Sequence, residues 1–218
     1  QGKDHFNKTL NWAVQLALFI ALPATLGLLM LSQPILTTLF QYGAFNESDT
    51  LMASMSLMAY SLGLPAFILI KILANAFYAR QDSRTPVRIG IIAMAVNMIL
   101  NVIFVLALLN YTDIPAHVGL ALATTGSAYC NAGLLALALR REQYLTLGRP
   151  FTVMLLKILI AVAGMTLLLF IFSQGIHLWT QLDWFKRLFE LLLLIMPAIL
   201  CYVLLLWIMG IRPRHLAH

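Results

Sequence analysis

Residues 188–207 read LFELLLLIMPAILCYVLLLW, a twenty-residue run in which Glu190 is the only charged side chain. A helix of about 20 apolar residues crosses the hydrocarbon core of a bilayer, which is about 30 Å thick. This run therefore predicts a transmembrane helix and indicates that the fold is formed in a membrane.

The rest of the chain has the same character. Of its 218 residues, 61% are hydrophobic and only 10% are charged, whereas a soluble domain is about half apolar and a quarter charged. The apolar runs are continuous and rich in Leu and Ala rather than alternating, which excludes a membrane β-barrel. We therefore predict an all-α, polytopic helical membrane protein.

Six runs are long enough to cross the membrane. They cover residues 10–31, 51–79, 87–109, 117–139, 151–173 and 187–209. The segment QPILTTLFQYGAFN (33–46) is too short to cross, and it has Pro34 at its start and Gly43 near its end. It predicts a short interfacial or re-entrant helix. Pro23, Pro65 and Pro197 fall inside spans and predict kinks there.

Charge predicts the orientation of these spans. Ten basic residues share one face: Lys3, Lys8, Arg80, Arg84, Arg88, Arg140, Arg141, Arg149, Arg212 and Arg214. The opposite face carries four acidic residues, with Lys186 and Arg187 as basic exceptions. Short loops rich in Lys and Arg stay in the cytoplasm. Both ends of the chain are therefore predicted to be cytoplasmic.

The stretch NAFYARQDSRTPVRIG (75–90) places three arginines, Asp82 and Pro86 together in one of these loops. Its arginines are either topology signals or contacts to an anionic ligand or headgroup. Lys71 precedes Arg80 by nine residues, about 13 Å along a helix. That depth favours a cavity or the bundle interior over lipid, so Lys71 is either an anion contact or a structurally paired lysine.

A second polar group lies within the predicted spans. Asn97 and Asn101 are one helical turn apart, and Thr124 and Thr125 lie midway along the fourth span. Together they predict either a cation or headgroup site or ordinary interhelical hydrogen bonds. In the same span Gly119, Ala123 and Ser127 recur every four residues, which predicts a central helix that neighbours approach closely.

The sequence lacks the residue patterns that common catalytic and metal-binding sites require. The carboxylates form no pair at helical spacing, and the sequence contains no HExxH, GxSxG, P-loop or GxGxxG motif. We therefore predict no enzyme, no firm metal site and no cofactor. The net charge of +6 comes with no basic patch interleaved with aromatic residues on a soluble module, so nucleic-acid binding is not expected.

Three blocks carry a family resemblance: LFQYGAF (39–45), YSLGLPAFILIK (60–71) and AFYARQDSRTPVRI (76–89). Their order and spacing resemble the second half of the MurJ (MviN) lipid II flippase family, over essentially the whole chain. The family belongs to the multidrug/oligosaccharidyl-lipid/polysaccharide exporter superfamily. The resemblance implies a fourteen-helix protein with two six-helix lobes and two extra C-terminal helices.

The resemblance also implies an organisation and a function for this chain. Residues 1–141 would be four helices of the second lobe with the short helix at 33–46, and residues 142–218 the extra pair, forming a groove for a lipid tail. The protein would move lipid II across the bacterial inner membrane by alternating access, for cell-wall synthesis. Its partners would be lipid II, membrane lipids and a missing N-terminal lobe.

The resemblance bears on the site residues as well. The family's best-known substrate arginines lie upstream of this chain. Lys71 would contact the headgroup, with Arg80 and Arg84, while Asp82 and Pro86 would belong to a gate or anchor. Coupling would use Na⁺, H⁺ or the membrane potential.

Two alternatives stay open. One is an exporter of another lipid-linked oligosaccharide or a drug, with the same fold. The other is a membrane scaffold of the cell-wall machinery that transports nothing.

Overall fold

The computed structural model describes residues 2–111, 114–146, 148–173, 179 and 182–211. Every regular element in these ranges is helical. The helices are α1 (Gly2–Phe40), α2 (Glu47–Leu62), α3 (Leu64–Tyr78), α4 (Arg84–Tyr111), α5 (Ala116–Arg141), α6 (Arg149–Phe172) and α7 (Trp184–Ile208). Five are long and apolar enough to cross a membrane, and α2 with α3 makes a sixth candidate if the bent pair is one span. The predicted all-α membrane fold is confirmed.

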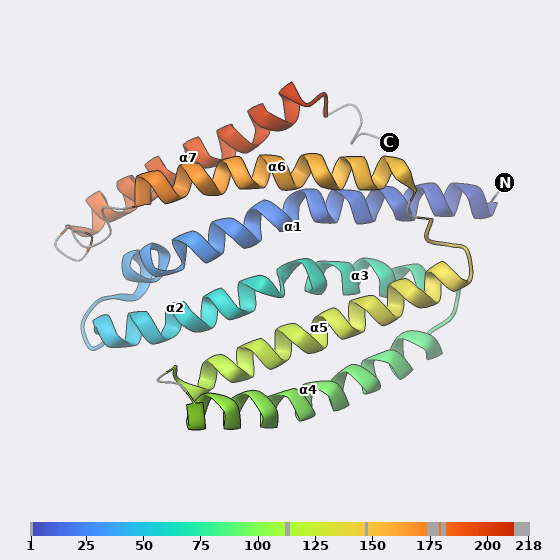
Figure 1. The fold of residues 1–218 in the computed structure, drawn as a ribbon, viewed down its shortest axis with the longest axis horizontal. Coiled ribbons are helices and arrows are strands. Elements are labelled where there is room, and N and C mark those ends of the chain that lie inside the picture. The colour runs from blue at the N-terminus through green and yellow to red at the C-terminus, as the bar shows by residue number, and fades with distance from the viewer. Residues whose placement is uncertain (1, 112–113, 147, 174–178, 180–181, 212–218) are drawn as a thin grey trace.

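Helix α1 lies between two groups of helices, as Figure 1 shows. On one side it contacts α2 and α3, and on the other it contacts α6 and α7. Helix α5 packs against α2, α3 and α4, whereas α4 has its main contact with α5. The predicted central position of the fourth span is therefore confirmed. The start of α1 and the end of α7 lie at the same end of the bundle (Figure 1).

The predicted separate helix at 33–46 is wrong. Residues 33–40 continue α1, which runs without a break through Pro23 and Pro34. Proline removes one backbone hydrogen bond, and neighbouring helices and hydroxyl side chains can compensate for this in a membrane. Here the Thr38 hydroxyl donates to the Pro34 carbonyl at 2.7 Å. The break falls instead at Gly43, whose φ of +59° is favourable for glycine.

The bend between α2 and α3 confirms the kink predicted near Pro65. The two helices meet at Gly63 at an angle of 41°, and Pro65 stands in the first turn of α3. A Cβ atom on Gly63 would lie 2.8 Å from the Thr125 hydroxyl and 2.7 Å from the Phe67 ring. Glycine is therefore needed at the bend because α5 approaches it closely.

The small-residue face of α5 packs as predicted. A Cβ atom on Gly119 would lie 3.1 Å from the Phe104 carbonyl carbon and 3.2 Å from the Val105 nitrogen, both in the backbone of α4. Ala123 and Ser127 on the same face are buried. Small residues let two helices approach at backbone distance, where dispersion contacts and hydrogen bonds replace the hydrophobic effect in lipid.

Candidate functional site

Basic residues gather at the end of the bundle where α1 and α6 begin and where α3 and α5 end, which we call the basic end. Contacts there join residues far apart in the sequence. Arg80, just past α3, forms an ion pair with Glu142, just past α5, at 2.5 Å. Lys3 of α1 donates to the Glu142 carbonyl at 3.2 Å. The structure thus brings the start of α1, the loop after α3 and the loop after α5, all of which belong to the predicted basic face, to one end of the bundle.

The side chains of Lys3, Phe6 and Arg80 all contact the ring of Tyr144 at the basic end. The Arg80 guanidinium lies 3.8 Å from the centroid of the Tyr144 ring, and the Lys3 ammonium lies 4.6 Å from it. Phe6 meets the same ring edge-on at 5.5 Å. A cation over an aromatic face is attracted by the ring quadrupole, so Tyr144 holds two cations that would otherwise repel each other.

Further contacts fasten the loop between α5 and α6 to α1. Asn7 donates to the Gln143 carbonyl at 3.0 Å, and Asn11 donates to the Thr146 hydroxyl at 3.0 Å. We call Lys3, Arg80, Glu142 and Tyr144 the basic-end clasp. Sequence reasoning did not find it, because Glu142 read as an isolated carboxylate and a loop tyrosine has no spacing signal.

Asp82, Arg84 and Pro86 form the start of α4. The Asp82 carboxylate accepts hydrogen bonds from the backbone N–H groups of Arg84 and Thr85, both at 3.1 Å. The Thr85 hydroxyl, these N–H groups and, more weakly, the Arg80 charge hold the pKa of Asp82 below its ordinary value. Pro86 stands in the first turn, where a missing N–H costs little. Arg84 is exposed.

Lys71 lies midway along α3 with an exposed side chain. Within the described residues it forms no ion pair or hydrogen bond. Asn75 and Tyr78 follow it at intervals of four and three residues, so all three share one helical face, and all three are exposed. This polar face of α3 contrasts with the apolar residues around it.

The predicted polar cluster is divided between two helix contacts. Asn101 donates to the Asn97 amide oxygen at 3.0 Å, Asn97 donates to the Ser127 hydroxyl at 3.3 Å, and that hydroxyl donates to the Thr124 carbonyl at 2.9 Å. Thr125 faces the other way and donates to the Ala59 carbonyl of α2 at 2.7 Å. The Asn97–Ser127 and Thr125–Ala59 hydrogen bonds join two helices each, which agrees with one of the two interpretations of the sequence, whereas the other two lie within α4 and within α5.

The described residues bring no three His, Cys, Asp or Glu side chains together in a way that suits a metal ion. Within the polar cluster the Asn101 amide oxygen is buried and accepts no hydrogen bond from the described residues.

The opposite end of the bundle contains a second fastening that the sequence analysis missed. Arg187 is buried and donates to the Leu182 carbonyl at 2.9 Å and to the Thr37 carbonyl of α1 at 3.2 Å. The Trp179 indole N–H donates to the Thr38 hydroxyl at 3.0 Å. Arg187, which interrupted the charge pattern in the sequence, therefore secures the start of α7 to the end of α1.

An apolar groove runs between these two fastenings. Its volume is about 580 Å³, and α1, α6 and α7 all contribute to its lining. Pro23 and Gly27 of α1 lie on one wall, and Ala198 and Tyr202 of α7 lie on the other. Tyr202 donates its hydroxyl to the Phe19 carbonyl at 2.7 Å, which joins the two walls. The lining offers almost no polar atoms, so the groove suits a hydrocarbon chain.

Comparison with known proteins decides the family. The family model described as "Lipid II flippase MurJ" matches residues 1–190, most of the chain. The chain belongs to the MurJ lipid II flippase family. MurJ proteins are transporters and not enzymes, which confirms the expectation from the missing catalytic motifs.

Relatives in several bacteria share this similarity. A probable lipid II flippase MurJ of Haemophilus influenzae is 40% identical over 212 residues, which are 97% of this chain and 40% of the relative. One of Vibrio cholerae is 38% identical over 98% of this chain and 39% of its own length. The chain therefore spans about two fifths of the MurJ relatives that it matches.

Proposed function

We propose that this chain is the C-terminal part of a flippase that moves lipid II across the bacterial inner membrane, for cell-wall synthesis. Membership of the MurJ family, with similarity to MurJ relatives over nearly the whole chain, is the observation that carries this proposal. Alternating access is the mechanism, in which this part and an upstream lobe rock about a central cavity.

The groove between α1 and the pair α6–α7 is the proposed place of the lipid tail. A polyprenyl chain needs a long apolar surface, and this groove offers one beside helices whose outer faces are exposed and apolar. The fastening at Arg187 and Trp179 holds the start of α7 to the end of α1, and the Tyr202 hydroxyl joins the same two walls within the groove. Residues 142–218 would then be the tail-binding unit and residues 1–141 the lobe.

The polar face of α3 is the proposed lining of the headgroup cavity. An uncompensated ammonium in hydrocarbon is costly, so an exposed Lys71 at mid-helix is better placed against a water-filled cavity than against lipid. Asn75 and Tyr78 extend this face with hydrogen-bonding groups. The pyrophosphate of lipid II is the anion that Lys71 would meet.

The residues near the basic end receive different proposed roles. Arg84 is exposed and is available to an anionic headgroup at the cavity mouth, whereas Arg80 is engaged by Glu142 and Tyr144 and acts as an anchor. Asp82 and Pro86 shape the gate by fixing the start of α4. With the basic end in the cytoplasm, both ends of this chain are cytoplasmic.

Transport would be driven by the membrane potential or by a coupled Na⁺ or H⁺. Within the predicted polar cluster, the buried oxygen of Asn101, with Asn97 beside it, is the group that such a cation would use.

The test is depletion and rescue with the complete protein that carries this chain. The resident flippase of a bacterium is depleted, the complete protein is expressed, and lipid II exposed on the outer leaflet is measured. We expect rescue by the wild type and a loss of at least tenfold in exposed lipid II with Lys71→Ala. Asn75→Ala, one turn away on the same face, should reduce exposure less, because it removes no charge.

Failure of the wild type to expose lipid II would refute the proposal and favour another lipid-linked substrate or a scaffold. Rescue by the wild type and equally by Lys71→Ala would keep the flippase and remove Lys71 from the headgroup site. Expression in the membrane is compared for all variants by immunoblot.

A further inference from the structure

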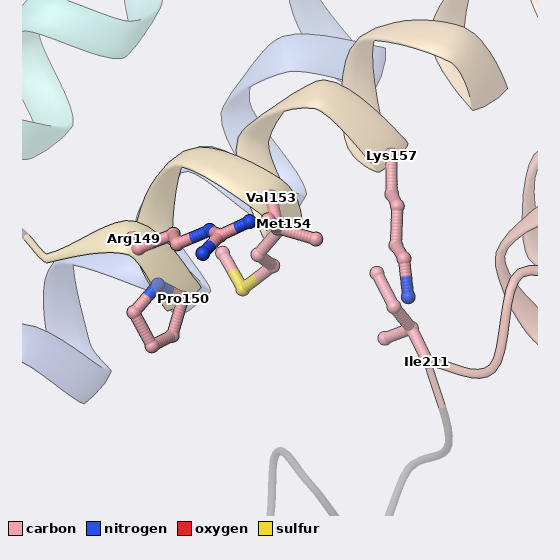
Figure 2. A pocket seen from close by; sticks show the side chains of 6 residues that line it. All are labelled: Arg149, Pro150, Val153, Met154, Lys157 and Ile211. Atoms are coloured by element: carbon pink, nitrogen blue, oxygen red, sulfur yellow. The ribbon is translucent and has the colours of Figure 1, made fainter.

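A hollow at the basic end lies apart from the tail groove and from Lys71. It has a volume of about 400 Å³ and is formed by the first turns of α6 and by Ile211, three residues past the end of α7. Its lining consists of Arg149, Pro150, Val153, Met154, Lys157 and Ile211. Figure 2 shows the Lys157 side chain extending from α6 toward Ile211, and the Arg149 side chain lying beside Met154.

Two cations line this hollow without a carboxylate to neutralise them. Among the described residues neither Arg149 nor Lys157 forms an ion pair. From Gln143 to His218 the only carboxylate side chains are Asp183 and Glu190, at the far end of α7. Arg149 and Lys157 therefore give the lining of the hollow two positive charges, which favour an anion.

Lys157 is held in place by a single contact. Its ammonium donates to the Met209 carbonyl at the end of α7, at 2.7 Å. An ammonium has three N–H donors, so the others remain for a ligand. Arg149 forms no side-chain hydrogen bond with the described residues, and its guanidinium offers five donors. It also stands at the start of α6, where the helix dipole favours an anion.

We propose that this hollow binds the headgroup phosphate of an anionic glycerophospholipid from the adjacent membrane leaflet. Arg149 and Lys157 hold the phosphate from two sides. Pro150, Val153, Met154 and Ile211 contact the glycerol and the first carbons of the acyl chains. Basic pockets between transmembrane helices at the membrane surface are suited to such headgroups.

The lining selects a phospholipid over a free anion. Outside its two cations the hollow is apolar, so a small hydrated phosphate would leave most of this surface facing water. A phospholipid covers the apolar wall and meets both charges at once. The site also joins the start of α6 to the end of α7, so an occupied hollow would stabilise this pair independently of any transported substrate.

The experiment titrates phosphatidylglycerol into the complete protein in detergent micelles and measures the bound fraction by native mass spectrometry. Phosphatidylcholine with the same acyl chains serves as the uncharged reference. We expect phosphatidylglycerol to bind in preference. Arg149→Gln should weaken its binding about fivefold, because a basic residue near an anionic lipid surface contributes about that factor. Lys157→Gln should weaken it similarly.

Matched variants separate a site from a general charge effect. Arg88→Gln removes an exposed arginine of α4 outside the hollow and should leave binding unchanged. Arg149→Lys keeps the charge and should remain within about twofold of wild type. Arg149 forms no ion pair or side-chain hydrogen bond in the described part of the chain, so Arg149→Gln keeps the test valid even if Lys157→Gln unfolds the end of α7.

Three results would overturn the proposal. The first is equal binding of the two lipids, and the second is an equal loss with Arg88→Gln and Arg149→Gln. The third is displacement of phosphatidylglycerol by inorganic phosphate, which would assign the hollow to a free anion. None of these measurements depends on lipid II transport, so the proposal and the flippase function can fail separately.

Discussion

The Arg80 guanidinium forms an ion pair with the Glu142 carboxylate at 2.5 Å and joins the end of α3 to the end of α5. The same guanidinium lies over the Tyr144 ring at 3.8 Å. The side chains of Arg80 and Glu142 are 24% and 40% exposed, so water screens the ion pair, and the stacking on Tyr144 is the better protected contact.

This geometry predicts that Arg80 cannot be replaced by lysine without loss. Arg80→Lys keeps the charge but loses the planar group that stacks on Tyr144. We expect a double-mutant cycle between Arg80→Lys and Tyr144→Leu to give a coupling of about 0.5–1 kcal/mol, from unfolding in detergent. The coupling should persist at high salt, whereas coupling of Arg80 to Glu142 should shrink. Additive effects of Arg80→Lys and Tyr144→Leu would contradict the stacking.

The bend at Gly63 predicts a glycine requirement. Gly63→Ala would place a Cβ 2.7 Å from the Phe67 ring and 2.8 Å from the Thr125 hydroxyl, so both side chains must shift. Overpacking of this kind costs about 1–3 kcal/mol. Thermal unfolding in detergent checks this cost. Gly133→Ala on α5 is the matched control, since its Cβ meets no atom within 4 Å. It should be neutral or slightly stabilising.

The cap at Asp82 predicts a dependence on acid pH. Hydrogen bonds from the Thr85 hydroxyl and from backbone N–H groups hold the pKa of Asp82 below its ordinary 3.8. Because its pKa is lower in the folded state, the ionised Asp82 carboxylate stabilises the folded protein, and this stabilisation is complete above the ordinary pKa. It is lost as the pH falls through the lower, folded-state pKa. Amide exchange in the first turn of α4 should therefore speed up several-fold only below about pH 4.

Two substitutions check the assignment to Asp82. Asp82→Asn keeps an oxygen acceptor but does not titrate, so exchange at the start of α4 should lose its pH dependence. Asp82→Ala removes the acceptor, and exchange should be fast at every pH. The measured exchange rates are first corrected for the pH dependence of intrinsic amide exchange. If the corrected wild-type rates do not change with pH, the cap is excluded.

The Asn97 network predicts a modest structural role. Asn97→Leu removes the link from Asn101 to Ser127 and leaves the Asn101 amide without its partner oxygen. Interhelical hydrogen bonds in membranes contribute about 0.6 kcal/mol on average and at most about 1.7. We expect a loss of about 1 kcal/mol. Asn110→Leu, near the end of the same helix, serves as control; an equal loss there would remove the network's role.

Five of the six predicted spans are single helices in the structure, and they were predictable because each depends on a local property. A helix crosses the membrane when about 20 consecutive residues are apolar, and this needs no knowledge of its neighbours. The run at 188–207 and the face of Gly119, Ala123 and Ser127 could therefore be interpreted correctly from their own residues. Pro34 could not, since a proline ends a helix or stays inside one depending on what packs around it.

Hydropathy and charge are properties of single segments, so the membrane class, most of the spans and the concentration of basic residues at one end could be predicted without a structure. Which of the described basic residues form ion pairs depends on how the helices pack. Arg80 is engaged by Glu142 and Tyr144, whereas Lys71 and Arg149 form no ion pair with a carboxylate in the described part of the chain. The physical reason is that a charge's role depends on the groups within a few ångströms, and those groups come from distant helices.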